Sequence, residues 1–120
     1  MNVYESLPPP PDYLTNYGLA KWSEVGSRLV EMGELSEANI DVLRLYCEAW
    51  EDFREAIDEL KAHGSSTCVS EKGGHYAHPS VSRKSAAIKR LEKFGKQLGW
   101  SQVKDAVKKT NKVSSRPAGL

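Results

Sequence analysis

The residue types best suited to metal chemistry in this 120-residue sequence lie between positions 64 and 80, in the stretch GSSTCVSEKGGHYAHPS. This stretch holds Cys68, His75 and His78, and thiolate and imidazole groups are common zinc ligands. A fourth ligand and a paired Cys-x-x-Cys half-site are missing, which favours three polar loop residues over a metal centre. We therefore predict neither a metal ion nor another cofactor.

Catalytic motifs are also missing from the sequence. No serine lies in a Gly-x-Ser-x-Gly pattern, and Cys68 has no identifiable base and orienting group. The Gly73-Gly74 pair is not followed by the Gly-Lys-Ser/Thr of a phosphate-binding loop. The carboxylates between positions 48 and 59 follow a regular helical face and do not suggest a selected acid–base pair. We expect a protein that is not an enzyme.

Basic side chains carry the most functional information, because the two halves of the chain have opposite charge. Residues 1–60 contain 13 acidic and 4 basic side chains, whereas residues 61–120 contain 13 basic and 3 acidic ones. A basic surface of this kind can bind the phosphates of nucleic acid. The predicted DNA-binding residues are Arg83, Lys84, Lys89, Arg90, Lys93, Lys96, Lys104, Lys108, Lys109 and Lys112. Alternatively, these side chains form a solvated face that compensates a neighbouring acidic helix, and charge alone leaves both readings open.

Three helices must position these charges. The first is predicted from about Thr15 to Met32, with an apolar stripe at three- and four-residue spacing. The stripe consists of Leu19, Trp22, Val25, Leu29 and Met32. Gly18 and Gly26 each lower helix stability by about 1 kcal/mol relative to alanine, so this helix needs tertiary packing.

The second helix is predicted to start after an N-cap at Ser36, with Leu35 and Ile40 as a hydrophobic staple, and to end at His63 before Gly64. Apolar residues cover more of its surface than a single neighbouring helix would bury. We therefore predict contacts between subunits of a homo-oligomer through Val42, Leu45, Tyr46, Ala49, Trp50 and Phe53.

The third helix is predicted from Pro79 or Ser80 to Gly99, with Lys89, Lys93 and Lys96 on one face. Its core stripe is Val81, Ala87, Ile88, Leu91, Phe94 and Leu98. Two β-compatible pieces, at 67–69 and 75–77, flank the Gly-Gly pair before it. The expected fold is therefore mainly α, with an N-terminal helix and a long antiparallel αα-hairpin that carries a short β-hairpin-like tip.

The expected organisation is a Pro-rich N-terminal arm at 1–13, a helical domain at 14–100 and a basic C-terminal tail at 101–120. We expect the arm to be extended and to lie outside the core. In the tail we expect a short helix in SQVKDAVKKTNK and disorder in VSSRPAGL. No run of residues approaches the ~20 apolar positions of a membrane span, and the N-terminus lacks the pattern of a secretory signal. These features predict no membrane association and a cytoplasmic location.

The order and spacing of several short motifs resemble one family of bacteriophage terminase small subunits, over about residues 8 to 99. The first half of the resemblance lies in the Pro-rich lead into Tyr13-Leu14, Ala20-Lys21-Trp22, Leu29-Val30, Gly33-Glu34-Leu35-Ser36, Asp41 and Leu43. The second half lies in the long acidic helix, the Gly-containing hairpin that ends in His78-Pro79, and the closing Gln97-Leu98-Gly99.

The resemblance implies a non-catalytic packaging factor of an infected bacterial host cell. Such proteins form ring-like homo-oligomers that bind double-stranded viral DNA and regulate the terminase large subunit, which holds the ATPase and nuclease. One alternative is a helical protein–protein interaction adaptor without DNA binding, which would use Pro8–Pro11 or the acidic face as its contact. Another is a metal-dependent nuclease.

Overall fold

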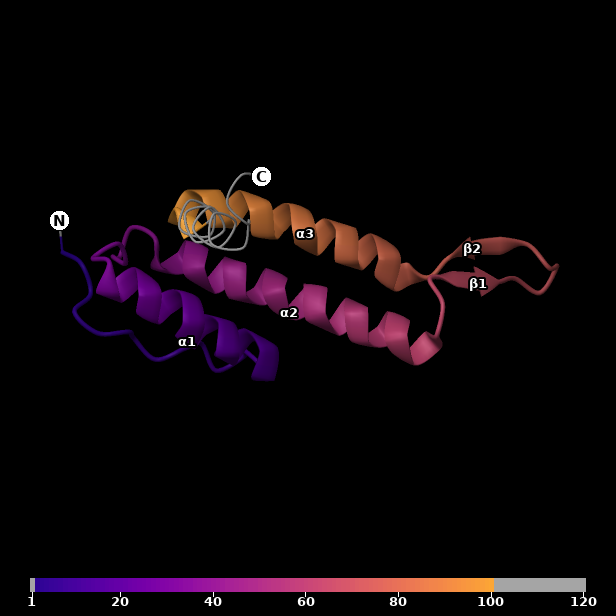
Figure 1. The fold of residues 1–120 in the computed structure, drawn as a ribbon, viewed down its shortest axis with the longest axis horizontal. Coiled ribbons are helices and arrows are strands. Elements are labelled where there is room, and N and C mark those ends of the chain that lie inside the picture. Colours follow the sequence, from indigo (N-terminus) through magenta and orange to yellow (C-terminus); the bar gives the residue numbers. More distant parts are fainter. Residues whose placement is uncertain (1, 101–120) are drawn as a thin grey trace, which may run out of the picture.

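The computed structural model describes residues 2–100. Its elements are α1 (Asn16–Glu31), α2 (Ile40–His63), β1 (Thr67–Val69), β2 (His75–Ala77) and α3 (Pro79–Leu98). The three helices lie side by side with α2 in the middle, and the two strands project beyond one end of the helices (Figure 1). The predicted mainly α fold, with three helices and a short two-stranded tip, is confirmed.

The connection between α2 and α3 reverses the chain through a small antiparallel sheet. Its register pairs residues 67, 68 and 69 with 77, 76 and 75, respectively. Gly73 turns the tip with φ of +84°, a conformation that L-residues rarely adopt. At the base, the backbone N–H of His78 donates to the carbonyl of Ser66 at 2.9 Å. The Nδ1 atom of His78 then caps α3 by accepting from the N–H of Ser80 at 3.0 Å.

Small residues allow α2 and α3 to approach closely. Ala49 and Ala56 of α2 are fully buried, as are Ser80, Ala87 and Gly95 of α3. A Cβ atom at position 95 would lie 3.4 Å from the ring of Tyr46. Of the larger members of the predicted α3 stripe, Leu98 is buried as expected, Val81, Leu91 and Phe94 are half-buried, and Ile88 is exposed. The core seam of α3 is therefore made chiefly by small side chains.

The core stripe of α1 is narrower than predicted. Trp22, Val25 and Leu29 are buried as expected, but Leu19 and Met32 are exposed. The reason is that α1 packs mainly against α2 and the N-terminal segment, and these contacts leave the positions of Leu19 and Met32 uncovered. Met32 also follows the last helical residue, Glu31, and serves as the C-cap.

The predicted start of α2 is wrong by one turn. The N-cap is Asn39, and Ser36 belongs to the turn that precedes it. In that turn the N–H of Ser36 donates to Oδ1 of Asn39 at 2.8 Å, and the Ser36 hydroxyl accepts from the N–H of Ala38. Ser36 also forms an isolated antiparallel β-bridge with Val3. This bridge holds the backbone of Ser36 against the N-terminal segment, outside the helix.

The N-terminal segment is extended as expected, but it lies against the core instead of outside it. The N–H of Tyr4 donates to the carbonyl of Leu35 at 2.8 Å, and the indole N–H of Trp22 donates to the carbonyl of Pro8 at 3.0 Å. Leu7 packs over Gly26 of α1, where an added Cβ atom would overlap a Leu7 methyl group. Residues 2–14 therefore contribute to the same core as the helices.

Candidate nucleic-acid interface

The acidic face of α2 is occupied by contacts within the chain. Three of its carboxylates point to the N-terminal region. Glu48 accepts a hydrogen bond from the hydroxyl of Tyr13 at 3.3 Å, and Asp58 accepts one from the hydroxyl of Tyr17. Glu51 accepts from hydrogen-bond donors at the start of α1. The other three, Asp52, Glu55 and Glu59, face α3. These carboxylates therefore join the N-terminal region and α3 to the central helix.

The contacts of Glu51 are the most organised on the α1 side. Its carboxylate accepts from the hydroxyl and backbone N–H of Thr15 and from the N–H of Gly18. These donors lie at the N-terminus of α1, where backbone N–H groups lack helical partners and the helix dipole favours negative charge. A residue of α2 therefore caps α1.

On the α3 side, two arginines neutralise the remaining carboxylates. Arg83 lies 2.8 Å from Glu59 and 3.4 Å from Glu55, and Arg90 lies 2.6 Å from Asp52. Partial burial by itself would lower the pKa of Arg83. The net effect is a raised pKa, because Glu59 contributes a hydrogen bond and negative charge, and Asp52 and Glu55 add further negative charge. Hydrogen bonds lower the pKa of the Glu59 carboxyl; the bond from the Ser80 hydroxyl has the larger effect and the bond from Arg83 the smaller one.

Five of the six predicted DNA-binding residues of α3 therefore divide into two groups. Arg83 and Arg90 face α2, whereas Lys89, Lys93 and Lys96 lie on the adjoining face of α3 with exposed side chains. Within residues 2–100, none of these three lysines forms an ion pair. We call this set the lysine face.

The lysine face surrounds a shallow surface hollow that Glu92 and Gln97 complete. Lys93 also lies 5.6 Å from the ring centroid of Phe94, a distance at which a cation is attracted to the aromatic face. Lys84 belongs to neither group, because it is half-buried beside Ile57 and Leu60. The predicted contacts Lys104, Lys108, Lys109 and Lys112, and the predicted helix and disorder of the tail, lie outside the described residues.

The predicted subunit-contact residues of α2 have different environments. Tyr46 and Ala49 are buried inside the chain itself, and burial raises the pKa of Tyr46 to about 12. Val42, Trp50 and Phe53 are half-buried, and Leu45 is exposed. Trp50 is partly covered by Lys21, whose ammonium lies 3.9 Å from the indole centroid. A subunit contact through this set stays a prediction.

The sequence-based metal candidates are not brought together. Cys68 pairs with Tyr76 while His75 pairs with Val69, so Cys68 and His75 project from opposite faces of the hairpin. The neighbour of Cys68 is instead His63, whose Nε2 lies 3.7 Å from the sulfur, and the His63 and His78 rings are 4.8 Å apart. Sequence reasoning placed His63 at a helix end and missed this contact. Among the described residues, no group of three potential ligands could hold a metal ion.

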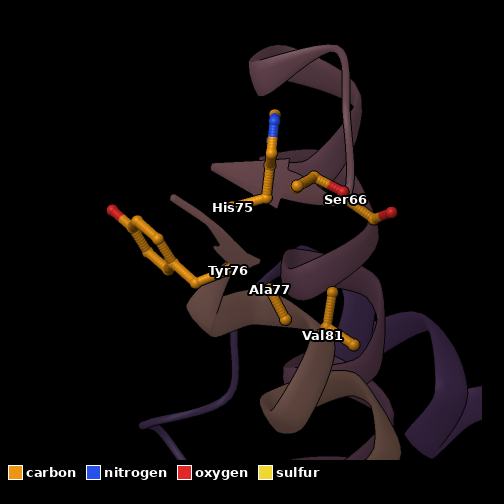
Figure 2. Close-up of a pocket in the computed structure, with 6 residues that line it drawn as sticks. Ser66, His75, Tyr76, Ala77 and Val81 are labelled. Atoms are coloured by element: carbon orange, nitrogen blue, oxygen red, sulfur yellow. The ribbon is translucent and has the colours of Figure 1, made fainter. Parts of the chain in front are cut away.

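A second hollow lies where the hairpin meets α3. It is lined by Ser66, Thr67, His75, Tyr76, Ala77 and Val81. Figure 2 shows Ala77 and Val81 close together, with His75 and Tyr76 pointing in different directions around the hollow. The lining groups therefore do not converge as the residues of a catalytic centre do.

Residues 18–115 match the family described as phage terminase, small subunit. No curated protein and no solved structure matches the chain. Across the described residues, no helix combines the length and apolar composition needed to cross a bilayer. The match extends from the first turn of α1 through all three helices, and the chain therefore belongs to the phage terminase small-subunit family.

Proposed function

We propose that this protein is a non-catalytic packaging factor that binds double-stranded viral DNA as a homo-oligomer and regulates the ATPase and nuclease of the terminase large subunit. Family membership supports the packaging role. The observation that carries the DNA-binding proposal is the division of charge on α3. Arg83 and Arg90 are engaged with carboxylates of α2, while the ammonium groups of the lysine face are exposed and unpaired within residues 2–100.

The lysine face suits phosphates better than base edges. Lysine ammonium groups are point charges on flexible stems, and they attract phosphate without fixing a base sequence. Lys89, Lys93 and Lys96 recur at four- and three-residue spacing, so they form one row along the helix. Neutralising three phosphates releases counterions from the duplex, which makes affinity fall with salt at a logarithmic slope of about −2.7.

The test is a gel-shift or anisotropy titration of duplex DNA over a salt series. In the triple variant Lys89→Gln/Lys93→Gln/Lys96→Gln we expect affinity to fall more than tenfold and the salt slope to become shallower by about 2 to 3. The matched control, Arg28→Gln/Arg44→Gln/Lys72→Gln, removes the same charge elsewhere and should change affinity less than threefold. Equal affinity and slope in the triple variant and the wild type would overturn the assignment.

The alternative is a helical adaptor without DNA binding. The acidic face proposed for its contact is engaged within the chain, and the carbonyl of Pro8 is already bonded to Trp22. These contacts favour the DNA-binding proposal. Failure of the wild type to bind duplex DNA at low salt, together with direct binding to the purified large subunit, would favour the adaptor.

A further inference from the structure

The end of the molecule that carries the hairpin combines exposed apolar groups with positive charge. Val69 and Tyr76 are 62% and 53% exposed. The hollow of Figure 2 adjoins a second one that contains Lys61 and Lys84, and the two share Ser66. Glu71 at the tip opposes this charge, as do Asp58 and Glu59 in the last turns of α2, which are engaged with Tyr17 and Arg83. We call Lys61, Lys84, Val69, Tyr76 and Val81 the hairpin-end surface.

At the other end of the molecule, the region around the end of α1 is acidic and is also apolar in part. Val3 and Met32 are each 45% exposed, and Glu31 and Glu34 lie beside Met32 in the sequence. Within residues 2–100, neither carboxylate forms an ion pair. Glu5 and Glu37 add negative charge near this end, whereas Arg28 and, at the end of α3, Lys96 oppose it. We call Val3, Glu31, Met32 and Glu34 the α1-end surface.

The two surfaces cannot meet within one chain. Figure 1 shows the hairpin beyond one end of the helices and the α1–α2 connection at the other. The 24 residues of α2 separate them, which corresponds to about 36 Å of helix. A contact between the surfaces therefore needs two copies of the chain.

We propose that the hairpin-end surface of one copy docks on the α1-end surface of the next. Both surfaces expose large apolar side chains, and their charges are of opposite sign. Apolar contact supplies association energy, while complementary charge sets the pairing and speeds encounter. The inference rests on the proposed homo-oligomer and names its contact.

This contact is heterologous, because it joins different surfaces of identical chains. Each added copy leaves one free surface of each kind, so the contact repeats until the chain of subunits closes into a ring or continues as a filament. Isologous dimers, in contrast, use the same patch on both subunits and stop at two. The proposal therefore predicts assemblies larger than a dimer.

The experiment is charge-reversal complementation, read as mass by light scattering without DNA. One variant carries Lys61→Glu and Lys84→Glu, and the other carries Glu31→Lys and Glu34→Lys. Each alone places like charges at the contact, so we expect each to lose assembly and remain monomeric. Mixing them in equal amounts restores opposite charges wherever the two variants alternate, so the mixture should form assemblies larger than a dimer, with the wild-type mass if the number of subunits is even.

A matched control, Lys89→Glu/Lys93→Glu, reverses two lysines of the lysine face and should leave the mass unchanged. Circular dichroism checks that every variant is folded. A monomeric wild type would overturn the proposed homo-oligomer together with this contact. An oligomeric wild type whose mass survives both reversals, or variants that remain monomeric on mixing, would overturn this contact alone.

Discussion

The carboxylate of Glu51 on α2 accepts a hydrogen bond from the backbone N–H of Gly18, in the first turn of α1, at 3.2 Å. A Cβ atom at position 18 would lie 2.7 Å from Cδ of Glu51. Glycine at this position lowers helix propensity, yet it is the residue that lets the carboxylate reach the end of α1. The two helices are joined at this point by a polar contact as well as by the apolar core.

Gly18→Ala should therefore destabilise the protein even though alanine is the better helix former. The Glu51 side chain must withdraw and lose hydrogen bonds to a charged acceptor, each contributing about 1.5–3 kcal/mol, against a propensity gain of about 1 kcal/mol. We expect the free energy of unfolding in urea to fall by about 1–2 kcal/mol.

The control for Gly18→Ala is the same change in a Glu51→Ala background. There the obstructing carboxylate is gone, so alanine should raise the free energy of unfolding by up to about 1 kcal/mol relative to glycine. A loss of similar size in both backgrounds would show that the Gly18–Glu51 approach is not the cause.

Replacing Arg90 tests whether the arginines of α3 stabilise the helical hairpin. Arg90→Gln removes the 2.6 Å ion pair with Asp52, and the pair is partly exposed, so we expect a loss of about 0.5–1 kcal/mol in thermal or urea unfolding. The loss should shrink in high salt. Lys89→Gln, one position away on the lysine face, should leave stability within about 0.5 kcal/mol of the wild type.

Two leucines test the observed core against the predicted one. Leu7 is half-buried and packs over Gly26, whereas Leu19 is exposed although its spacing predicted a core position. Leu7→Ala should lower the free energy of unfolding by about 1–2 kcal/mol, and Leu19→Ala by less than about 0.5 kcal/mol. The reverse order in urea unfolding would contradict the docking of the N-terminal segment.

The sequence predicted the element types well because the apolar periodicity and the glycine stops act locally. Gly64 and Gly99 end their helices in left-handed conformations, as the pattern indicated. The environments of Leu19 and Ser36 depend instead on distant residues. Leu19 is exposed because α1 has α2 as its packing partner, and Ser36 is held by Val3. Neither relationship has a signature in the local sequence.

The sequence predicted that the helix at 79–98 is basic, but not which of its basic side chains are engaged in ion pairs within the chain. Helical spacing placed Lys89, Lys93 and Lys96 on one face. It did not reveal that Arg83 and Arg90 are used by Asp52 and Glu59, because ion pairing between helices depends on their relative rotation. Charge counting therefore indicated a candidate interface but not which of its cations are engaged within the chain.

The Glu59 carboxylate should make stability depend on acidic pH. Hydrogen bonds, chiefly from Ser80 and secondly from Arg83, lower its pKa below the ordinary value of 4.5, so the folded state favours the ionised carboxylate. This contribution is present above pH 4.5 and is lost as the pH falls through the native pKa. The wild type should therefore lose more unfolding free energy than Glu59→Gln between about pH 5 and pH 3. Parallel pH profiles for the two proteins would contradict this role for Glu59.

The two cysteines should differ sharply in reactivity because Cys47 is fully buried and Cys68 is half-exposed. Thiolate is the reactive form, and burial raises the pKa of the Cys47 thiol to about 12. In a short exposure to a thiol reagent, the native protein should be modified at Cys68 alone.

A Cys68→Ser variant should react with the reagent only as fast as the protein unfolds. Intact-mass spectrometry in the absence and presence of urea measures both rates, and rapid labelling of the native Cys68→Ser variant would contradict the burial of Cys47.

The same burial predicts a loss of stability at alkaline pH. An unfolded chain ionises Cys47 above about pH 9, whereas the native chain keeps the thiol protonated, so deprotonation favours unfolding. Tyr46 acts in the same direction, because burial raises its pKa to about 12. Between about pH 9 and pH 11 the free energy of unfolding should fall more in the wild type than in Cys47→Ala. In the variant it should still fall with rising pH, but less steeply, because Tyr46 remains buried. Urea unfolding of both proteins across this range measures the difference, and profiles of equal slope would show that Cys47 does not ionise on unfolding.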